Sequence, residues 1–289
     1  MSKGSLFWGN ATGRLGESVF YRAGGEQRNR TYVKNVKNPK TKSQMSNRIQ
    51  MLNLSIIFKE LAEILRVSFP NRSAKESGFN AFVKANKSAT SSVNLKSNLE
   101  QGIVAPYQYF VSKGDLILPQ PSVIATKDNK QVYGYQMSDG RDKDESSSAW
   151  FGLLVRDLEL PEGTKVTIVK GRYVDEGWKL GYAIYDSAFV AAPPVLRGES
   201  VEVTLESVGD EFEGNVLSFG ASNDADLLAV IFSYTDTNGK LKVNTAQFRA
   251  MTANGISTAA EDFQGPDGFV YEQVLEAYGY NNDSALSTK

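Results

Sequence analysis

Hydrophobic residues follow two different spacings along this chain, one before and one after about residue 90. In residues 42–67, Met45, Ile49, Leu52 and Ile56 recur every three to four positions, and the stretch contains no proline or glycine. Such spacing places apolar side chains on one face of a helix. It predicts one amphipathic helix of about seven turns.

Capping signals mark where this helix begins and where a second one follows. Thr41 and Gln44 have the spacing of a capping box, and Phe69-Pro70 ends the apolar pattern. Ser73 and Glu76 repeat the capping-box spacing ahead of another apolar run. We therefore expect a shorter second helix, packed against the first as an antiparallel pair.

The segment before the long helix predicts a basic β-hairpin. Residues 4–16 contain four glycines and are expected to be irregular. Residues 17–22 and 27–36 have β-forming composition, with a glycine-rich turn between them. Because side chains alternate along a strand, the basic residues at 28, 30 and 34 are expected to share one face.

Beyond residue 106 the pattern changes to short β-forming stretches separated by turn residues. The candidate strands are Tyr107–Ser112, Ser122–Thr126, Gln131–Met137, Ala149–Arg156, Lys165–Arg172, Trp178–Tyr185, Ser200–Glu206, Gly214–Phe219, Leu227–Tyr234 and Lys240–Ala250. The clearest hairpin joins the last two strands through Asn238-Gly239, because this dipeptide accepts the positive dihedrals of tight turns. Regular strand spacing predicts an antiparallel sandwich, and its character is expected to be immunoglobulin-like.

Together these patterns predict an α+β chain, with an N-terminal basic β-hairpin and helix pair followed by an antiparallel β-sandwich (immunoglobulin-like) region. The expected divisions are 1–90 for the hairpin and two-helix module, 91–105 for a linker, 106–192 for a first β-sandwich unit and 193–289 for a second, with a short C-terminal helix near 269–278. A single large β domain is the alternative.

The net charge of −1 conceals an uneven distribution. Residues 1–100 carry 17 Lys and Arg, six Glu and no Asp, which gives +11, whereas the remainder carries 15 basic and 27 acidic residues, which gives −12. A cationic end suits an anionic partner, such as nucleic acid or an acidic protein surface. The alternative is attraction between the two halves, or between the halves of neighbouring copies.

Missing residue types exclude much chemistry. The chain has no cysteine and no histidine, which removes disulfides, thiolate nucleophiles, sulfur-ligated zinc and the commonest general base. We therefore predict that the protein is not an enzyme and uses no cofactor or metal. The first residues form no apolar stretch of signal-peptide length, and no run of 18 apolar residues occurs, so we expect no membrane span.

One acidic cluster needs separate consideration. Residues 139–145 gather four carboxylates, the hard-oxygen ligands that calcium prefers. However, their spacing is not that of an EF-hand, and Arg141 and Lys143 lie among them. A solvated loop is the better interpretation, because charge runs usually are solvated.

The candidate binding element is a basic stretch of about 35 residues. Its members are Arg14, Arg22, Arg28, Arg30, Lys34, Lys37, Lys40, Lys42 and Arg48. They are interleaved with Phe20, Tyr21 and Tyr32, and such combinations make phosphate contacts and stack on bases. The alternative is an arm that lies on an acidic neighbouring subunit, with arginines packed on aromatic rings.

The same N-terminal stretch also resembles a known family. The residues that carry the resemblance are Gly13–Arg22, Gly25–Gln27 and Val36–Gln44, with Asn47 and Arg48. This basic glycine-rich hairpin and Asn-Pro-Lys-Thr-x-x-Gln helix start resemble the beginning of a structural protein family of Bacteroidetes and their crAss-like phages. Similar helix starts occur in virion proteins of other tailed phages. The specific part covers about the first 50 residues, and the β half is similar in general character only.

The resemblance implies a structural component of a tailed-phage virion, made in the host bacterial cytoplasm: a capsid-associated, neck or tail ring protein. Its expected partners are further copies of the chain, other virion proteins and, through the basic region, nucleic acid. Two other classes are alternatives. One is a DNA-binding or packaged nucleoid-type protein, and the other is a carbohydrate-binding surface module, which exposed Trp150 and Trp178 would favour.

Overall fold

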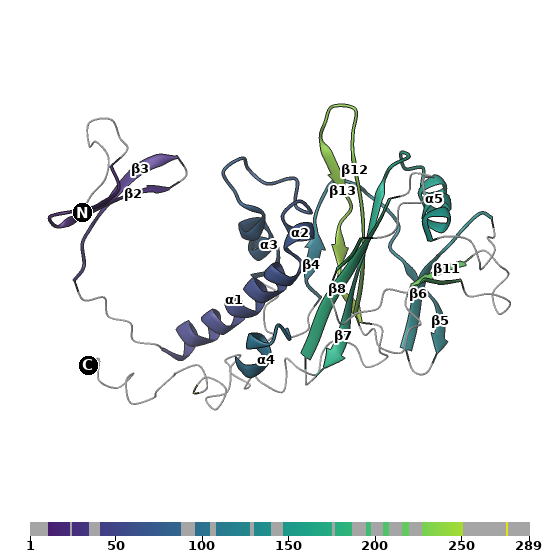
Figure 1. Ribbon diagram of the computed structural model, residues 1–289, viewed down its shortest axis with the longest axis horizontal. Helices are drawn as coiled ribbons and strands as arrows, with labels where there is room; N and C mark the ends of the chain where they lie inside the picture. Colours follow the sequence, from purple (N-terminus) through teal and green to yellow (C-terminus); the bar gives the residue numbers. More distant parts are fainter. Residues whose placement is uncertain are drawn as a thin grey trace. The chain divides into compact units, whose positions relative to one another are not determined.

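The computed structural model of the protein has two compact units, residues 1–40 with 281–289, and residues 41–280. The described residues are 11–23, 25–34, 41–87, 96–104, 108–127, 130–139, 147–174, 177–186, 195–197, 205–207, 216–219, 227–250 and 276. Helices and mostly antiparallel sheets occur together (Figure 1), so the predicted α+β class is confirmed.

The first unit contains a three-stranded antiparallel sheet in the order β1-β2-β3. Its strands are β1 (Gly13–Leu15), β2 (Ser18–Ala23) and β3 (Glu26–Thr31). The predicted hairpin is confirmed as β2 and β3, joined at Gly25, whose φ of +83° suits glycine. β1 is an additional strand, formed where irregular backbone was expected.

The long predicted helix begins where its capping box places it. Helix α1 (Lys42–Glu60) has Thr41 as its N-cap, whose Oγ1 accepts a hydrogen bond from the Gln44 amide at 3.4 Å. α2 (Ala62–Leu65) follows after a break at Leu61. The expected single helix is therefore two consecutive helices.

The predicted start of the second helix at Ser73 is wrong, because the helix begins later. Helix α3 (Gly78–Asn86) has Ser77 as its N-cap, whose Oγ accepts a hydrogen bond from the Asn80 amide at 3.1 Å. The backbone carbonyl of Ser73 instead accepts a hydrogen bond from the Glu76 amide at 2.9 Å, and this bond closes a turn ahead of the helix. Both serines have a polar residue three positions later, and the local pattern alone did not separate a turn from a cap.

The described residues of the second unit form three further sheets. The bounds of their strands are β4 (Phe110–Ser112), β5 (Ser122–Lys127), β6 (Lys130–Gln136), β7 (Lys165–Val174), β8 (Gly177–Asp186), β9 (Val195–Arg197), β10 (Leu205–Ser207), β11 (Val216–Phe219), β12 (Leu227–Thr235), β13 (Leu241–Val243), β14 (Ala246–Gln247) and β15 (Arg249–Ala250). A six-stranded sheet has the order β13-β12-β7-β8-β9, with β15 also paired to β12. A four-stranded sheet has the order β10-β11-β6-β5, and β14 pairs with β4.

Alternation along β12 divides the interior of this unit into two hydrophobic cores. Leu227, Ala229 and Ile231 belong to the core shared with helices α1, α2 and α3. The intervening Leu228, Val230 and Phe232 belong to the core shared with α5 (Ser147–Asp157) and with β6 and β11. The six-stranded sheet is therefore a central layer, buried on both faces.

The candidate strand at residues 149–156 is wrong, because these residues form part of helix α5. Trp150, Phe151, Leu153, Leu154 and Val155 are all buried. A run that is buried on every side carries no clear period, so the pattern did not distinguish a strand from a short helix.

Residues in the expected linker also take part in the fold. Residues 96–100 form helix α4 (Lys96–Glu100). Val104 exchanges two backbone hydrogen bonds with Trp178 of β8, at 2.8 and 2.9 Å. The expected boundary between two β-sandwich units, at residue 192, lies within the span of the six-stranded sheet, because strands from both sides of that residue pair in it.

The predicted hairpin at residues 227–249 is confirmed for its turn and its first pairs. Gly239 has a φ of +74°, and β12 pairs with β13 from Ser233 opposite Val243 to Thr235 opposite Leu241. The expected C-terminal helix near 269–278 lies outside the described residues, apart from Glu276.

Candidate functional site

The register of the first sheet decides which basic side chains lie together. Arg30 is opposite Val19, Arg28 is opposite Tyr21, and Arg14 of β1 is also opposite Val19. Directly paired residues of an antiparallel sheet project from the same face. Arg14, Arg28, Arg30, Val19 and Tyr21 therefore share one face, which we call the arginine face.

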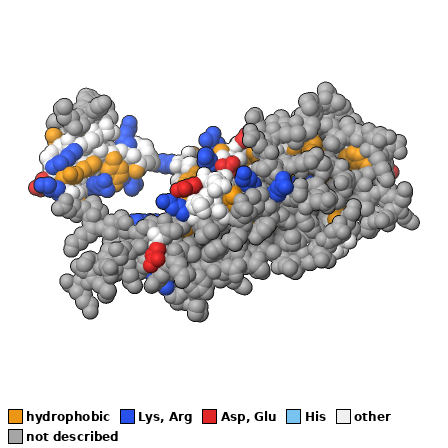
Figure 2. All heavy atoms as spheres, turned by 60° about the horizontal axis from the view of Figure 1, so that its bottom comes forward, with side chains coloured by type: hydrophobic (Ala, Val, Ile, Leu, Met, Phe, Trp, Pro, Cys, Tyr) orange, Lys and Arg blue, Asp and Glu red, His pale blue; other side chains and the backbone are white. Residues whose placement is uncertain are grey.

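The opposite face of this sheet carries a different set of side chains. Arg22 pairs with Gln27, and Phe20 pairs with Asn29, so these residues project away from the arginine face. Of the three cations expected to share a face, Arg28 and Arg30 do so, and Arg14 joins them. Lys34 is not part of this face, because β3 ends at Thr31 and not at residue 36 as expected. Figure 2 shows Lys and Arg side chains around hydrophobic ones on this unit, at the left of the view.

Contacts on the arginine face leave its charges in solvent. The Arg14 guanidinium carbon lies 3.6 Å from the centroid of the Tyr32 ring, and its Nε donates a hydrogen bond to the Gly16 carbonyl at 2.9 Å. Arg28 lies 3.6 Å from the Glu26 carboxylate in an ion pair whose side chains are both more than half exposed. Such surface pairs contribute little to stability, so Arg28 can exchange Glu26 for another anion.

The arginine face belongs to a sheet with little interior of its own. None of the described residues of β1, β2 and β3 is buried, and Tyr21 is 39% exposed. Ala11 is buried in this unit, and its amide donates to the Gln27 side chain at 3.0 Å. A small sheet normally needs a hydrophobic face for independent stability. The described residues of the three strands therefore supply no buried core of their own.

The remaining basic candidates lie elsewhere. Lys34 follows β3 and is exposed, whereas Lys37 and Lys40 lie outside the described residues. Lys42 and Arg48 lie on α1 in the second unit, where the Arg48 guanidinium is 3.8 Å from the Met45 sulfur. Sequence reasoning missed the Arg14–Tyr32 contact, because it did not predict β1.

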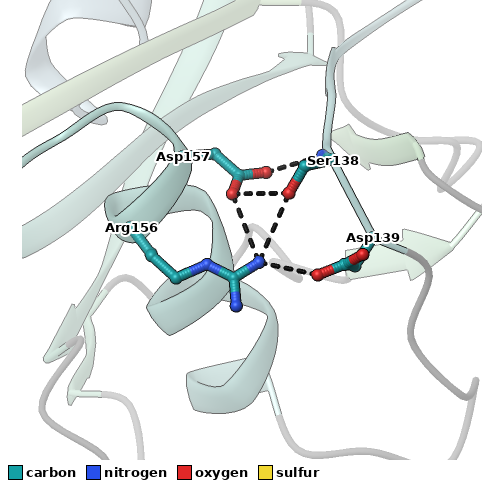
Figure 3. Close-up of polar contacts among 4 residues, drawn as sticks. All are labelled: Ser138, Asp139, Arg156 and Asp157. Atoms are coloured by element: carbon teal, nitrogen blue, oxygen red, sulfur yellow. Dashed lines mark hydrogen bonds and ion pairs between the residues drawn. The ribbon is translucent and has the colours of Figure 1, made fainter.

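A second polar cluster joins the end of β6 to the end of α5 (Figure 3). Ser138 donates to the Asp157 carboxylate through its amide, at 2.7 Å, and its hydroxyl, at 2.8 Å. Arg156 donates to Asp139 at 2.9 Å, and that hydrogen bond raises the pKa of the guanidinium. These contacts join the residues after β6 to the end of α5, and Asp157, with a side chain 15% exposed, is the least exposed of the three charged groups. The rest of the acidic loop, residues 140–146, lies outside the described residues.

No group of three or more acidic side chains in the described ranges is placed to hold a metal ion. Trp150 and Trp178 are only 5% and 7% exposed. Exposure of these two tryptophans would have favoured a carbohydrate-binding module, and that condition is not met. Both are core residues, which is the ordinary place for large aromatic side chains.

Asp157 gives a prediction about acid stability. Burial raises the pKa of this carboxyl, but hydrogen bonds from Ser138 and the nearby Arg156 outweigh burial, so its pKa is lowered overall. A lowered pKa stabilises the fold above the ordinary pKa of aspartate, and this contribution is lost as pH falls through the folded value. Asp157→Asn is expected to cost about 1 kcal/mol at pH 7, and the difference from wild type is expected to shrink as pH falls below the ordinary pKa of aspartate and through the lower folded value.

Urea unfolding of both proteins between neutral and acidic pH measures this difference. Asp139→Asn is the matched control, because Asp139 is largely exposed and its loss is expected to cost less than about 0.5 kcal/mol. A constant difference between Asp157→Asn and wild type at all pH values would show that the carboxylate charge does not stabilise the loop.

The fold and the site define a mixed α+β protein with a separately packed, arginine-bearing sheet. No family model, no curated protein and no solved structure matches this chain. None of the helices in the described ranges combines the length and the apolar character that a membrane crossing requires.

Proposed function

We propose that this chain is a non-enzymatic structural component of a tailed-phage virion, which docks through its arginine face on an acidic surface. The observation that carries the docking role is the gathering of Arg14, Arg28 and Arg30 on one exposed face of a sheet with no buried strand residue. The virion setting is supported by the N-terminal motifs, which resemble those of phage structural proteins.

Charge gives a physical route to self-assembly. The arginine face lies in the cationic first hundred residues, and the remaining chain carries a net charge of −12. Complementary charges accelerate encounter and fix orientation more than they add affinity. If one copy's basic sheet contacts the next copy's acidic region, the interface is heterologous and closes into a ring or extends as a filament.

Measurement of mass in solution tests this proposal. The full chain of 31.7 kDa is expected to form multiples of that mass at about 50 mM salt and to dissociate toward monomers at about 500 mM, because salt screens exposed charges. In addition, purified phage particles are expected to contain the protein. A monomer at every salt concentration, together with absence from particles, would contradict the proposal.

Nucleic acid is the second candidate partner, and one observation favours it. Tyr21 is 39% exposed and lies directly opposite Arg28, so a stacking ring and a phosphate-binding cation are adjacent. Under this alternative, affinity for unrelated DNA falls steeply with salt, since phosphate contacts release counterions. A gel retardation assay at two salt concentrations measures the slope. DNA retention without any self-association would favour a packaged DNA-binding protein instead.

We also propose that the β region is an immunoglobulin-like sandwich. It is supported by the second core, where side chains of the six-stranded sheet and of the four-stranded sheet pack together. Packing of two antiparallel sheets face to face is the general architecture of sandwich domains.

A further inference from the structure

A pocket of about 530 Å³ lies in the second unit, beside helix α3. Its walls come from three places in the chain: the segment after α2, helix α3, and the segment after β4 with Thr245. The lining residues are Phe69, Asn71, Arg72, Glu76, Ala81, Lys84, Ala85, Lys113, Gly114, Asp115 and Thr245. Pockets of this volume are typical of sites for small organic ligands.

Alanine and glycine residues leave room for the pocket, and the buried Phe69 forms part of its lining. Phe69 is buried, and its ring centroid lies 6.1 Å from that of Phe82 in an edge-to-face contact. Ala81 and Ala85 line the α3 side with single methyl groups. A Cβ atom on Gly114 would lie 2.1 Å from the Val243 carbonyl oxygen, so this wall requires glycine. This wall of the pocket is therefore formed by closely packed backbone, whereas its mouth is open to solvent.

Polar contacts hold the rim in place. Arg72 donates to the backbone carbonyls of Arg66 and Phe69 at 2.8 and 3.2 Å. Asp115 accepts hydrogen bonds from Asn71 and, at 3.1 Å, from the Lys240 ammonium group. These two hydrogen bonds, that from Lys240 first, lower the pKa of Asp115 and keep it charged. Both the segment after α2 and the segment after β4 are thus fixed without a ligand.

The charges that remain favour an anion. The lining contains three cations, Arg72, Lys84 and Lys113, and two carboxylates, Glu76 and Asp115. Lys240 compensates Asp115, so three positive groups face one negative group. Lys84 and Lys113 are exposed and extend from different walls, α3 and the segment after β4. The two lysines therefore border the pocket from different sides.

We propose that this pocket binds an organic anion, with a carboxylate or phosphate between Lys84 and Lys113 and an apolar body against Phe69 and Ala85. Phe69 and the two alanines favour an apolar body, and the lysines favour a negative charge. Neither inorganic phosphate nor a neutral aromatic molecule satisfies both parts of the pocket. The site does not depend on the proposed virion role.

Titration calorimetry of the full chain tests the ligand class with four probes: phenyl phosphate, phenylacetate, inorganic phosphate and benzyl alcohol. At least one of the aromatic anions is expected to bind saturably, and about ten-fold more tightly than inorganic phosphate or benzyl alcohol. The stronger of the two distinguishes a phosphate ligand from a carboxylate ligand. Absence of saturable binding by both aromatic anions, or equal binding by inorganic phosphate, would overturn the proposal.

Variants locate the binding. The Lys84→Gln, Lys113→Gln double variant is expected to weaken the better probe by about ten-fold or more. Ala85→Leu keeps every charge but fills the pocket, and is expected to weaken binding similarly. The control Lys59→Gln, Lys165→Gln removes two exposed lysines outside the pocket and should leave affinity unchanged. Equal weakening by that control would place the binding elsewhere. Unchanged melting temperatures show that each variant is folded.

Discussion

Replacement of Asn244 by leucine is expected to lower the free energy of unfolding by about 3 kcal/mol, the largest effect of a single substitution that we predict. Asn244 is 2% exposed and lies immediately after β13. Its Oδ1 accepts a hydrogen bond from the Phe232 amide at 2.9 Å, and its Nδ2 donates to the Val230 carbonyl at 3.2 Å. Leucine has a similar size but leaves both backbone groups of β12 unsatisfied in the interior.

Chemical denaturation with a fluorescence or circular dichroism readout measures this loss. Asn80→Ala is the control, because Asn80 is exposed on α3 and its substitution should change stability by less than about 0.5 kcal/mol. The Ser112 hydroxyl donates to the Asn244 carbonyl at 2.7 Å and accepts from the Ala246 amide at 3.1 Å, so Ser112→Ala should weaken the same region. A loss below about 1 kcal/mol for Asn244→Leu would contradict the bridging role.

The triple variant Arg14→Gln, Arg28→Gln, Arg30→Gln is expected to weaken docking on the anionic partner by about 10- to 100-fold. Each exposed cation contributes roughly 0.5–1 kcal/mol at low salt, and the three act on one surface. Light scattering across protein concentrations measures the change in self-association, and DNA retardation measures it for nucleic acid. The folding of the second unit should be unaffected, because the arginine face lies in the first unit.

A pair of single variants isolates the face from the total charge. Arg28→Gln and Arg22→Gln make the same chemical change on neighbouring strands, but Arg28 belongs to the arginine face and Arg22 to the opposite face. Arg28→Gln is expected to weaken docking several-fold, and Arg22→Gln by less than about two-fold. Equal effects of the two variants would show that the sheet acts through its overall charge and not through one face.

Local sequence patterns predicted the structure correctly where the backbone conformation depends on residues that are close in sequence. The capping pair Thr41 and Gln44 placed the start of α1, and Asn238-Gly239 placed the turn between β12 and β13. Alternation placed Arg28 and Arg30 on a common face. These features depend on backbone dihedrals and side-chain period, which a short stretch of sequence specifies.

Burial on all sides made one local pattern ambiguous. The apolar run of α5 reads equally as a strand, because a helix enclosed by other elements does not need a polar face. Its helical form follows from its place against the central sheet, where Phe151 packs on Tyr185 with ring centroids 4.4 Å apart. The sequence of residues 147–157 alone does not specify this packing against the sheet.

The sequence by itself determined the α+β class, the basic first hundred residues, the long helix start and the last hairpin. Only the tertiary structure decided that Arg14 lies on the same face as Arg28 and Arg30. It also decided that the Asn244 side chain forms hydrogen bonds with the backbone of β12, and that Lys84 and Lys113 line one pocket. The physical reason is separation along the chain. Strand pairing, buried polar bonds and pocket walls join residues that are far apart in sequence, and local period and composition do not specify which distant partners meet.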